Sequence, residues 1–385
     1  MEYVKLEEIC TIVSGGTPSR SKSDYWNNGN IPWIKIKDMK SKYIDSAEEF
    51  ITEEGLNNSS TKMLKSDTIL YSIFATLGEV GILKIDACTN QAIAGLSLKE
   101  DSNILKEYLY YYLKSKKKDV NNLGRGVAQN NINLSLLRKF RIPVIPLHQQ
   151  KKIIEVLDNV SNTTTNYERE LELLDELVKA RFVEMFGDEN NSKGWKIVNI
   201  EDVANVQVGV VIKPSQYYTD PNNGIKAFRS LNIGNGYIKD DDWVYFSEEG
   251  NRKNKKSILS TNDVLVVRSG APGTACVVTS EYEGTNAIDV IIAHPDFKKV
   301  DPYYLCTYTN MSHGKSQIIE GTGGAAQQHF NVGKYNKLKL MLPPLEYQKQ
   351  YVKFLEEVDK SRSRIQKSLE ASQELFDSLM QEYFG

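Results

Sequence analysis

The stretch "PLHQQKKIIEVLDNV" (Pro146–Val160) has a counterpart, "PLEYQKQYVKFLEEV" (Pro344–Val358), 198 residues later. Each copy begins with a proline, which suits the first turn of a helix because its missing N–H has no partner there. Apolar residues then recur at helical spacing. Gln150 and Gln348 lie in the first turn, where each either caps its helix or contacts the adjacent module. Identical residues in the first copy are Pro146, Leu147, Gln150, Lys151, Leu157, Val160, Leu171, Glu172, Glu176, Leu177, Glu184, Phe186 and Gly187.

The repeat also extends upstream of these helices. "VKLEEIC" (Val4–Cys10) resembles "VNIEDVA" (Val198–Ala204), and Thr89-Asn90 recurs as Thr285-Asn286. The sequence therefore predicts a tandem duplication in which each copy is a globular module followed by a long helix. The predicted boundaries are 1–146 and 188–344 for the two modules, and 147–187 and 345–385 for the two helices.

The two long helices carry matching heptad patterns. Their apolar positions alternate steps of four and three residues, which predicts a coiled-coil seam. Because the first helix ends at the second module, the second helix is expected to run back antiparallel, giving a circularly organised chain with two modules about a pseudo-two-fold axis. Two unrelated helices of separate domains are the alternative. Weak helix formers in "SNTTTN" (Ser161–Asn166) predict a softened point. The predicted seam is Ile153, Leu157, Val160, Tyr167, Leu171, Leu174, Val178, Tyr351, Leu355, Val358, Ile365, Leu369, Phe376 and Leu379.

Composition predicts a globular protein of the cytoplasm. Hydrophobic residues make up 40% and charged residues 25% of the chain, as in ordinary soluble domains. No apolar run is long enough for a membrane helix, and the N-terminal sequence lacks the pattern of a signal peptide. The four cysteines lie far apart, which argues against a disulfide framework or a zinc site. A net charge of −2 argues against a globally basic nucleic-acid binder and leaves local basic surfaces open.

Each module mixes short strands, glycine- and asparagine-rich loops and a helix or two, which predicts an α/β (α+β) fold. "WIKIKDM" (Trp33–Met39) alternates isoleucines with lysines, so it is predicted to be a half-buried strand with Lys35 and Lys37 facing solvent. "TILYSIF" (Thr68–Phe74) and "DVLVVRS" (Asp263–Ser269) are predicted to be buried strands. The apolar spacing of Asn103–Lys118 predicts an amphipathic helix.

No catalytic motif is complete. "HGKS" (His313–Ser316) has the end of a phosphate-binding loop, but the required first glycine is absent. "LPPL" (Leu342–Leu345) lacks the polar and aromatic residues of an adenine methyltransferase motif and is better explained as the turn before the second helix. Asp38 and Lys40 have the spacing of a nuclease site without its upstream acidic residue. We therefore predict no catalytic residue and no metal site, which favours a protein that reads or connects other molecules.

Candidate DNA-binding residues gather in loops of both modules. Sequence-specific contacts need Arg or Lys for guanine, Asn or Gln for adenine and polar groups for phosphate, and neighbouring glycines let the backbone approach a phosphate. A solvated surface position is the simpler explanation for any single residue, so the prediction depends on the set recurring in both modules. The candidates are Gly15, Gly16, Thr17, Arg20, Lys35, Lys37, Arg125, Gln129, Asn130 and Asn131, and in the second module Arg229, Arg268, Ser269, Gly323, Gln327, Gln328 and His329.

Together these features resemble the specificity subunit of Type I restriction-modification systems over essentially the whole chain. The second copy departs from the opening motif, because "VQVGVVIKPSQ" (Val206–Gln216) replaces Gly-Gly-Thr-Pro. The resemblance is carried by "VSGGTPSR…YW…GNIPWIKIKDM" (Val13–Met39), "GRGVAQNNINLSLLRKFRIPVIPLHQQKKI" (Gly124–Ile153) and "TGGAAQQHFNVGKYNKLKLMLPPLEYQKQ" (Thr322–Gln350).

The resemblance implies two target recognition domains, each reading one half of a split double-stranded DNA sequence. It implies that the helices set the spacing and bind two adenine-N6 methyltransferase subunits, and that ATP-driven restriction subunits join the complex. The chain itself would bind no cofactor, while its partners use S-adenosylmethionine, ATP and Mg²⁺. Two other classes stay open from the residues alone: a coiled-coil scaffold that binds proteins at both ends without DNA, and a nuclease acting through Asp38.

Overall fold

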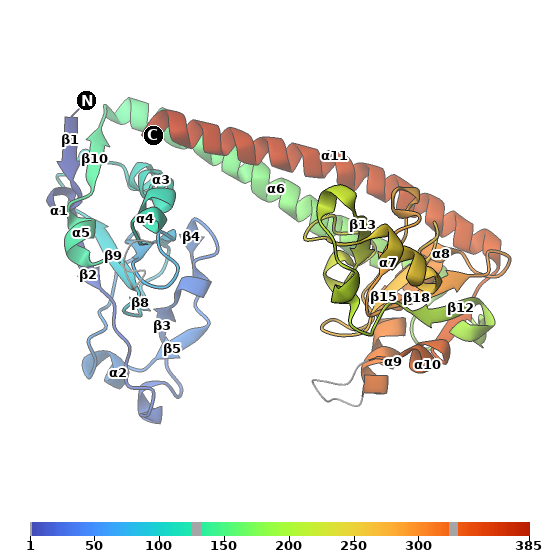
Figure 1. The fold of residues 1–385 in the computed structure, drawn as a ribbon. Helices are drawn as coiled ribbons and strands as arrows, with labels where there is room; N and C mark the ends of the chain where they lie inside the picture. The colour runs from blue at the N-terminus through green and yellow to red at the C-terminus, as the bar shows by residue number, and fades with distance from the viewer. Residues whose placement is uncertain (1, 125–131, 323–329) are drawn as a thin grey trace. The chain divides into compact units, whose positions relative to one another are not determined.

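The computed structural model describes residues 2–124, 132–322 and 330–385 and divides into two compact α+β units (Figure 1). The first unit comprises Met1–Glu168 and Lys367–Gly385, and the second comprises Arg169–Gln366. The first unit thus contains both ends of the sequence, as the predicted circular organisation requires. Each unit includes part of both long helices, α6 (Leu147–Phe186) and α11 (Leu345–Phe384). Within the described ranges, no helix combines the length and apolar character needed to cross a membrane.

A five-stranded sheet lies at the centre of the first unit, and Tyr71, Leu96 and Leu109 are buried between it and the helix α3. Its strand order is β2 (Cys10–Ser14), β9 (Ile93–Leu98), β6 (Ile69–Ser72), β7 (Val80–Leu83) and β4 (Tyr43–Ile44). A smaller sheet has the order β5 (Glu49–Ile51), β3 (Ile31–Ile34) and β8 (Cys88–Thr89), and β1 (Glu2–Lys5) pairs with β10 (Arg141–Val144). The helices are α1 (Leu6–Ile9), α2 (Glu53–Asn57), α3 (Lys106–Ser115), α4 (Lys117–Gly124) and α5 (Leu134–Arg138).

The second unit repeats this topology with one strand fewer in its main sheet. The main sheet has the order β12 (Ala204–Val208), β18 (Val290–Pro295), β15 (Val264–Val267) and β16 (Ala275–Val277). The smaller sheet has the order β14 (Val244–Phe246), β13 (Ile225–Phe228) and β17 (Asn286–Ala287), and β11 (Lys196–Asn199) pairs with β19 (Lys339–Leu342). The helices are α7 (Glu248–Lys253), α8 (Pro302–Asn310), α9 (Ser312–Thr322) and α10 (Val332–Asn336). The strand-by-strand correspondence supports the tandem duplication.

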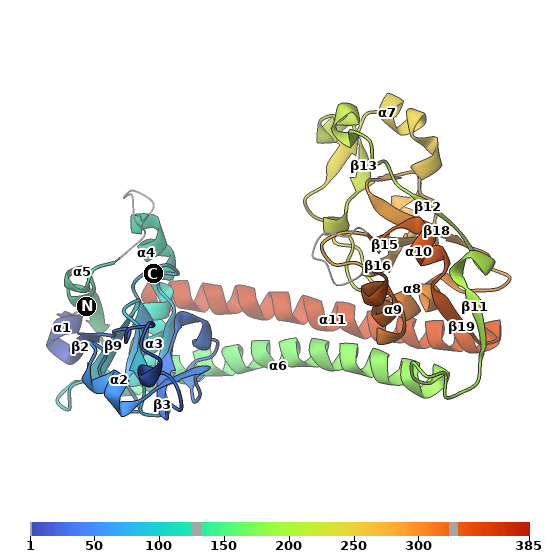
Figure 2. The ribbon, with the colours of Figure 1, turned by 90° about the horizontal axis from the view of Figure 1, so that it is seen from below.

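Within each unit, α6 and α11 pack side by side along the predicted seam (Figure 2). In the first unit, Leu157 near the start of α6 shares a core with Met380 and Phe384 at the end of α11. In the second unit, the end of α6 packs against the start of α11, so the helices are antiparallel. Arg362 donates to Asp175 Oδ1 at 2.6 Å across this pair. From Thr164 to Arg181, the side chains of α6 that are shielded from solvent are Thr164, Tyr167, Leu171, Leu174, Val178 and Arg181.

A buried glutamine attaches the start of each long helix to its own module. The Gln150 side chain is completely buried; its Oε1 accepts from Leu105 N at 2.8 Å, and its Nε2 donates to the Asn103 and Ile145 carbonyls at 2.8 and 2.9 Å. These bonds explain why the helix expected from Asn103 begins only at Lys106. The Gln150 side chain therefore contacts the adjacent module and the residue Ile145, just before its own helix.

Gln348 makes the same contacts in the second unit. Its Oε1 accepts from Asp301 N at 2.8 Å, and its Nε2 donates to the Lys299 and Pro343 carbonyls at 3.3 and 2.7 Å. Asp301 is the N-cap residue of α8, as Leu105 is of α3. Each glutamine thus satisfies a backbone N–H at a helix start, which lacks a partner within its own helix. We call these two side chains the glutamine clamps.

A buried phenylalanine attaches the end of each long helix to the other module. Phe384 of α11 packs against Tyr108 of α3, with ring centroids 5.3 Å apart. Phe186 of α6 packs in the same way against Tyr304 of α8, with ring centroids 4.8 Å apart. The two phenylalanines are identical positions of the repeat. Each module therefore holds the beginning of one long helix and the end of the other.

The structure also differs from the sequence predictions at other places, among them the strand predicted at Thr68–Phe74, which ends at Ser72. Residues 161–166 continue α6, where the Thr164 hydroxyl donates to the Val160 carbonyl at 3.1 Å, because seam packing outweighs weak helix propensity. The strand expected at Trp33–Met39 ends at Ile34, since Asp38 accepts from Lys35 N at 2.7 Å and closes a short 3-10 turn. The matched Thr89-Asn90 and Thr285-Asn286 pairs are not equivalent, because Thr89 occupies the place of Ala287 in the ladder.

We predict that the glutamine clamps stabilise their units. Gln150→Ala removes three hydrogen bonds to partly buried backbone groups and is expected to lower the free energy of unfolding by about 3 kcal/mol. Gln348→Ala should do the same in the second unit. Urea unfolding followed by circular dichroism measures both.

The neighbouring Gln149 and Gln350 are exposed and provide matched controls. Gln149→Ala and Gln350→Ala are expected to change the free energy of unfolding by less than about 0.5 kcal/mol. Equal changes in the free energy of unfolding for the buried and the exposed glutamines would show that the hydrogen bonds of the glutamine clamps do not stabilise the units.

Candidate nucleic-acid interface

The predicted loops of the first module meet at one end of its main sheet. Gly15, which follows β2, donates its N–H to the Ile93 carbonyl at 3.1 Å, and Ile73, which follows β6, donates to the Ala92 carbonyl at 2.8 Å. Ile132 donates its N–H to the Ile73 carbonyl at 2.9 Å. We call residues 15–20, 72–79 and 89–92 the first loop edge.

The second module brings equivalent loops together. Gly209, which follows β12, donates its N–H to the Val290 carbonyl at 2.9 Å, and Val210 donates to the Ala287 carbonyl at 2.8 Å. Phe330 donates to the Arg268 carbonyl at 3.2 Å, as Ile132 does to Ile73 in the first module. Residues 209–213, 268–273 and 287–289 form the second loop edge. Segments far apart in the sequence therefore converge in both modules.

Gly15 and Gly16 are needed for packing at the first loop edge. A Cβ on Gly15 would lie 2.1 Å from the Asn90 carbonyl oxygen, and one on Gly16 would lie 2.4 Å from the Thr61 nitrogen. The Gly16 N–H donates to the Thr89 carbonyl at 2.9 Å, so both glycine amides already have acceptors. The Thr17 hydroxyl donates to Gln91. Close packing accounts for the glycine pair without a phosphate contact.

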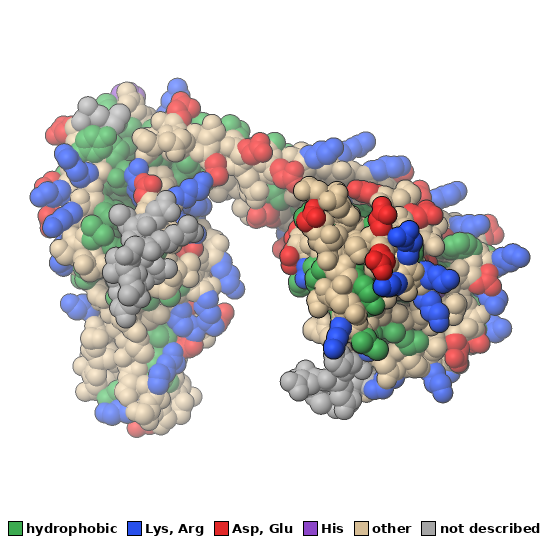
Figure 3. Space-filling view, in the orientation of Figure 1, with side chains coloured by type: hydrophobic (Ala, Val, Ile, Leu, Met, Phe, Trp, Pro, Cys, Tyr) green, Lys and Arg blue, Asp and Glu red, His purple; other side chains and the backbone are tan. Residues whose placement is uncertain are grey.

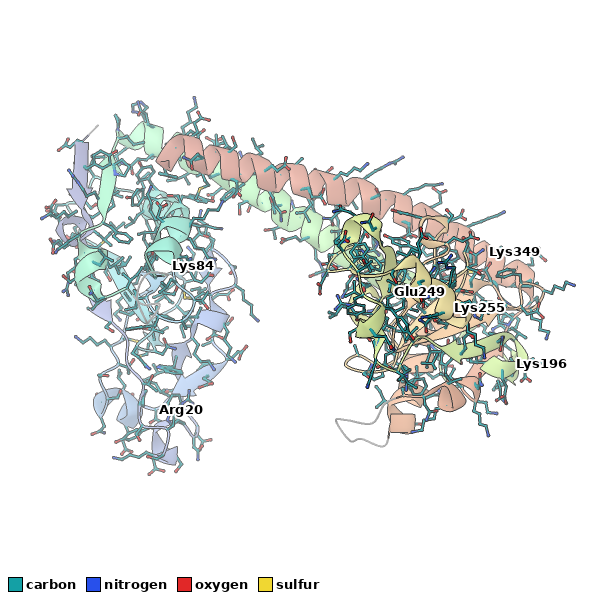
Figure 4. The ribbon with its side chains drawn as sticks, viewed as in Figure 1. Arg20, Lys84, Lys196, Glu249, Lys255 and Lys349 are labelled. Atoms are coloured by element: carbon teal, nitrogen blue, oxygen red, sulfur yellow. The ribbon has the colours of Figure 1, made fainter. Side chains whose placement is uncertain are left out.

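Two tryptophans hold the Ser14–Arg20 loop in place. Trp33 Nε1 donates to the Gly16 carbonyl at 3.0 Å, and Trp26 Nε1 donates to the Ser19 carbonyl at 3.1 Å. The Arg20 guanidinium lies 3.6 Å from the Trp26 ring centroid, and Figure 4 shows Arg20 in the part of the first unit away from α6 and α11. The motif from Val13 to Met39 is therefore one folding element. The second module has Ala227 in place of Trp33, in keeping with its loss of Gly-Gly-Thr-Pro.

The predicted DNA-contacting cations of the strands are paired within their own module. Lys35 pairs with Glu49 and Lys37 pairs with Glu48. Arg229, at the position equivalent to Lys35, lies 3.2 Å from Asp242. The sequence analysis did not predict these acidic partners. Glu49 lies opposite Trp33 in the β3–β5 ladder. The sequence "EEF" (Glu48–Phe50) was the signal that could have indicated them. Acidic and basic side chains are intermingled on the faces seen in Figure 3.

Arg268 has a structural role at the second loop edge. Its side chain is 14% exposed, and it donates to Asp289 Oδ1 at 2.6 Å and to the Phe330 carbonyl at 3.1 Å. Ser269 follows it in the same turn. Arg268 therefore connects the end of β15 to the residue at which the described chain resumes. The candidates Arg125, Gln129, Asn130, Asn131, Gly323, Gln327, Gln328 and His329 lie outside the described residues.

The residues weighed for chemistry have structural partners. Asp38 is the acceptor that closes the 3-10 turn after β3. His313 is buried in α9, with Nε2 3.1 Å from the Gly187 carbonyl oxygen at the end of α6. In the part of the chain that the structure describes, no group of His, Cys, Asp and Glu side chains is arranged to hold a metal ion.

The sequence matches the family described as "Type I restriction modification DNA specificity domain" over residues 1–176 and 192–373. The chain belongs to this family. Its two matched segments correspond to the two copies of the repeat. A curated relative, the EcoR124I/EcoR124II specificity subunit of Escherichia coli, is 34% identical over 183 residues, which is 45% of each chain. The MjaIX specificity subunit of Methanocaldococcus jannaschii is 24% identical and covers 88% of this chain and 82% of its own.

Solved structures of this family have the same fold. The S subunit of a Type I system from M. genitalium has a TM-score of 0.56 at 15% identity, covering 100% of this chain and 96% of its own. A structure from a study of type I R-M complex assembly has a TM-score of 0.62 at 15% identity, covering 100% and 97%. These similarities establish the duplicated α+β modules with paired long helices as the family fold.

We predict that Glu49 stabilises the first module in a pH-dependent way. Burial alone would raise the pKa of Glu49, but hydrogen bonds from Lys35 and Arg20 outweigh it and hold the pKa below its usual value. A lowered folded-state pKa stabilises the protein above the unfolded pKa of about 4.3, and this contribution disappears as the pH falls through the folded value. Glu49→Gln should therefore cost about 1 kcal/mol at pH 7, and this cost should shrink as the pH falls below the unfolded pKa of about 4.3 and through the folded value.

Urea unfolding of both proteins across pH 3 to 8 measures this difference. Glu100→Gln, at an exposed position, is the control and should run parallel to the wild type. A constant gap between Glu49→Gln and wild type at all pH values would contradict the ion-pair explanation.

Proposed function

We propose that this chain is the DNA specificity subunit of a Type I restriction-modification complex, in which each module reads one half of a bipartite, asymmetric double-stranded target. The observation that carries the proposal is the duplicated loop edge: the same backbone junctions recur in both modules, with different side chains in each. Gly16 corresponds to Val210 and Ile73 to Arg268, so the side chains that follow them also differ. Thr17 and Phe74 of the first module stand where the second module has Val211 and Ser269. One scaffold with two different surfaces suits two different half-sites.

In this proposal, the long helices set the distance between half-sites and bind two adenine-N6 methyltransferase subunits. Support comes from Leu177 and Leu375, which are the same position of the repeat and are 47% and 50% exposed. What supports a protein contact is that the same exposed leucine recurs in both helices, since contacts to phosphates need polar groups. Two equivalent leucines would provide two similar binding faces, and restriction subunits would join this core.

The proposed subunit performs no chemistry of its own. Asp38, the residue with a nuclease-like spacing, is used as a turn acceptor, and Lys35 beside it is paired with Glu49. We therefore assign S-adenosylmethionine, ATP and Mg²⁺ to the partner subunits. The alternative function is a coiled-coil scaffold that binds no DNA, and the following experiments distinguish it from the proposed one.

Shortening both helices tests the proposed spacer. Deleting Thr164–Glu170 and Gln366–Ser372 together removes one heptad from each helix and keeps the seam in phase. At 1.5 Å per residue the deletion removes about 10 Å, the rise of about three base pairs. Methylation mapping in cells should show the same two half-sites with a gap that is about three base pairs shorter.

Exchanging residues 1–146 for the module of another specificity subunit is the companion experiment and should change one half-site only. Altered half-sites with an unchanged gap after the heptad deletion would rule out the spacer. Absence of any methylated motif with the wild-type chain would rule out DNA specificity altogether.

The leucine pair gives a stoichiometric prediction. Leu177→Asp or Leu375→Asp alone should weaken the binding of one methyltransferase subunit by about tenfold or more, because a central apolar contact is lost. The double substitution should weaken both. Mass measurement of the purified complex distinguishes two, one and no bound subunits.

Leu173→Asp is a matched control, because Leu173 is 45% exposed on the same helix but corresponds to Ala371 in the repeat. It should leave two subunits bound. Equal loss from Leu173→Asp and Leu177→Asp would mean that the repeated leucine does not define the binding face.

A further inference from the structure

Two unusual backbone conformations lie at the loop edges. Among the described residues, Ala75 (φ 62°) and Lys213 (φ 41°) are the ones with a positive φ that are not Gly, Asn or Asp. This region is unfavourable for an alanine or a lysine, and such strain gathers at functional sites. Each of the two residues directly follows an exposed apolar side chain: Phe74 is 38% exposed and Ile212 is 79% exposed.

The turn that carries Phe74 is held firmly. The Ser72 hydroxyl donates to the Thr76 carbonyl at 2.5 Å and accepts from Glu79 N at 2.7 Å. Ile73 and Leu77 on either side are 2% and 1% exposed and belong to the core of the first unit. The turn therefore keeps its apolar flanks inside and presents Phe74 to solvent.

Phe74 lies within the first loop edge. Its neighbour Ile73 uses its N–H and its carbonyl to bond to Ala92 and Ile132. Ala92 follows Gln91, which accepts a hydrogen bond from Thr17. The loop that carries Phe74 is thus joined through residues 91 and 92 to the Ser14–Arg20 loop.

Ile212 lies in a different loop of the second module, the one that follows β12, and this loop belongs to the second loop edge. Val210 anchors the loop by donating to Ala287 and accepting from Asp289 N at 3.2 Å, and Asp289 pairs with Arg268. The Ile212 carbonyl accepts from Gln216 Nε2 at 3.4 Å, which restrains the loop while the side chain stays exposed. Val211 beside it is 50% exposed.

We infer that Phe74 and Ile212 are the apolar base contacts of the two modules, each entering a groove of the target duplex at its own half-site. This inference rests on the proposed function. Thymine methyl groups and the faces of stacked bases are features that polar side chains cannot read, and exposed apolar side chains at protein–DNA interfaces contact them. This contact would explain why the positive φ angles of Ala75 and Lys213 are kept beside two exposed apolar side chains.

The experiment uses the full chain assembled with its methyltransferase, and the target duplex is defined from the methylation pattern of the wild-type complex. Phe74→Ala and Ile212→Ala should each reduce affinity for this duplex about ten- to a hundredfold. Affinity for a random duplex and the salt dependence of binding should not change, because no charge is removed. Phe74→Leu and Ile212→Val should retain most of the affinity.

Base substitutions in the duplex assign each contact. Replacing target thymines one at a time by deoxyuridine, or adenines by 2-aminopurine, reports lost methyl contacts or unstacked bases. For the wild-type complex, the substituted base should change the affinity or the 2-aminopurine fluorescence at one half-site. The Phe74→Ala or Ile212→Ala complex should no longer show that change.

Tyr3→Ala and Ile197→Ala are the controls, since these residues are 49% and 52% exposed at equivalent positions of β1 and β11. They should bind the target as the wild type does, and all variants should unfold within about 2 °C of it. Wild-type affinity and base response in Phe74→Ala and Ile212→Ala would overturn this inference alone. A wild-type complex without any preferred duplex would overturn the proposed function, and this inference with it.

Discussion

The fold depends on one constraint: each module must hold two helix ends that come from different copies of the repeat. A glutamine clamp holds the beginning of the module's own helix, and a phenylalanine–tyrosine contact holds the end of the other helix. Both contacts are buried, so errors in either leave unsatisfied backbone groups or a cavity in the core. The seam between the helices adds apolar contacts along their length, but the clamps fix where each helix starts.

This constraint separates what the two copies share from what they do not. Gln150 and Phe186 recur unchanged as Gln348 and Phe384 because a buried amide or ring has few acceptable replacements. At the loop edges the backbone junctions persist while the side chains differ, because the junctions are made by main-chain N–H and carbonyl groups. The second module keeps Gly15 as Gly209 but has Val210 in place of Gly16 and Ala227 in place of Trp33, whose Nε1 donates to the Gly16 carbonyl in the first module. The side chains of the loop edges can thus differ between the modules while the sheets and the helix attachments stay the same.

Much of the fold followed from repetition and periodicity. A heptad pattern fixes which side of a helix is buried, so the shielded positions of α6 lie where the spacing places them. Local propensity was a weaker guide: Ser161–Asn166 stays helical because tertiary packing decides. The candidate site was predictable only in part. Glycines next to polar residues marked loops that converge at the loop edges, but Gly15 and Gly16 pack against Thr61 and Asn90. The acidic partners of Lys35 and Lys37 come from β5, which pairs with β3, and from the residue before it, and spacing alone does not reveal this pairing. Phe74 looked like part of a buried strand, because the hydrogen bonds of Ser72 that turn the chain outward leave no periodic signal.

The composition of the first unit has a consequence for how the chain is made. Its core includes Leu157 and also Met380 and Phe384, which are synthesised more than two hundred residues later. At 5 to 20 residues per second, the ribosome takes about 10 to 45 seconds to cover that distance. During this time the first module's tyrosines, Tyr108 among them, lack the partners that cover them. The second unit is made as one continuous segment and can complete its core first. The core of the first unit can therefore be completed only after the whole second unit has been synthesised.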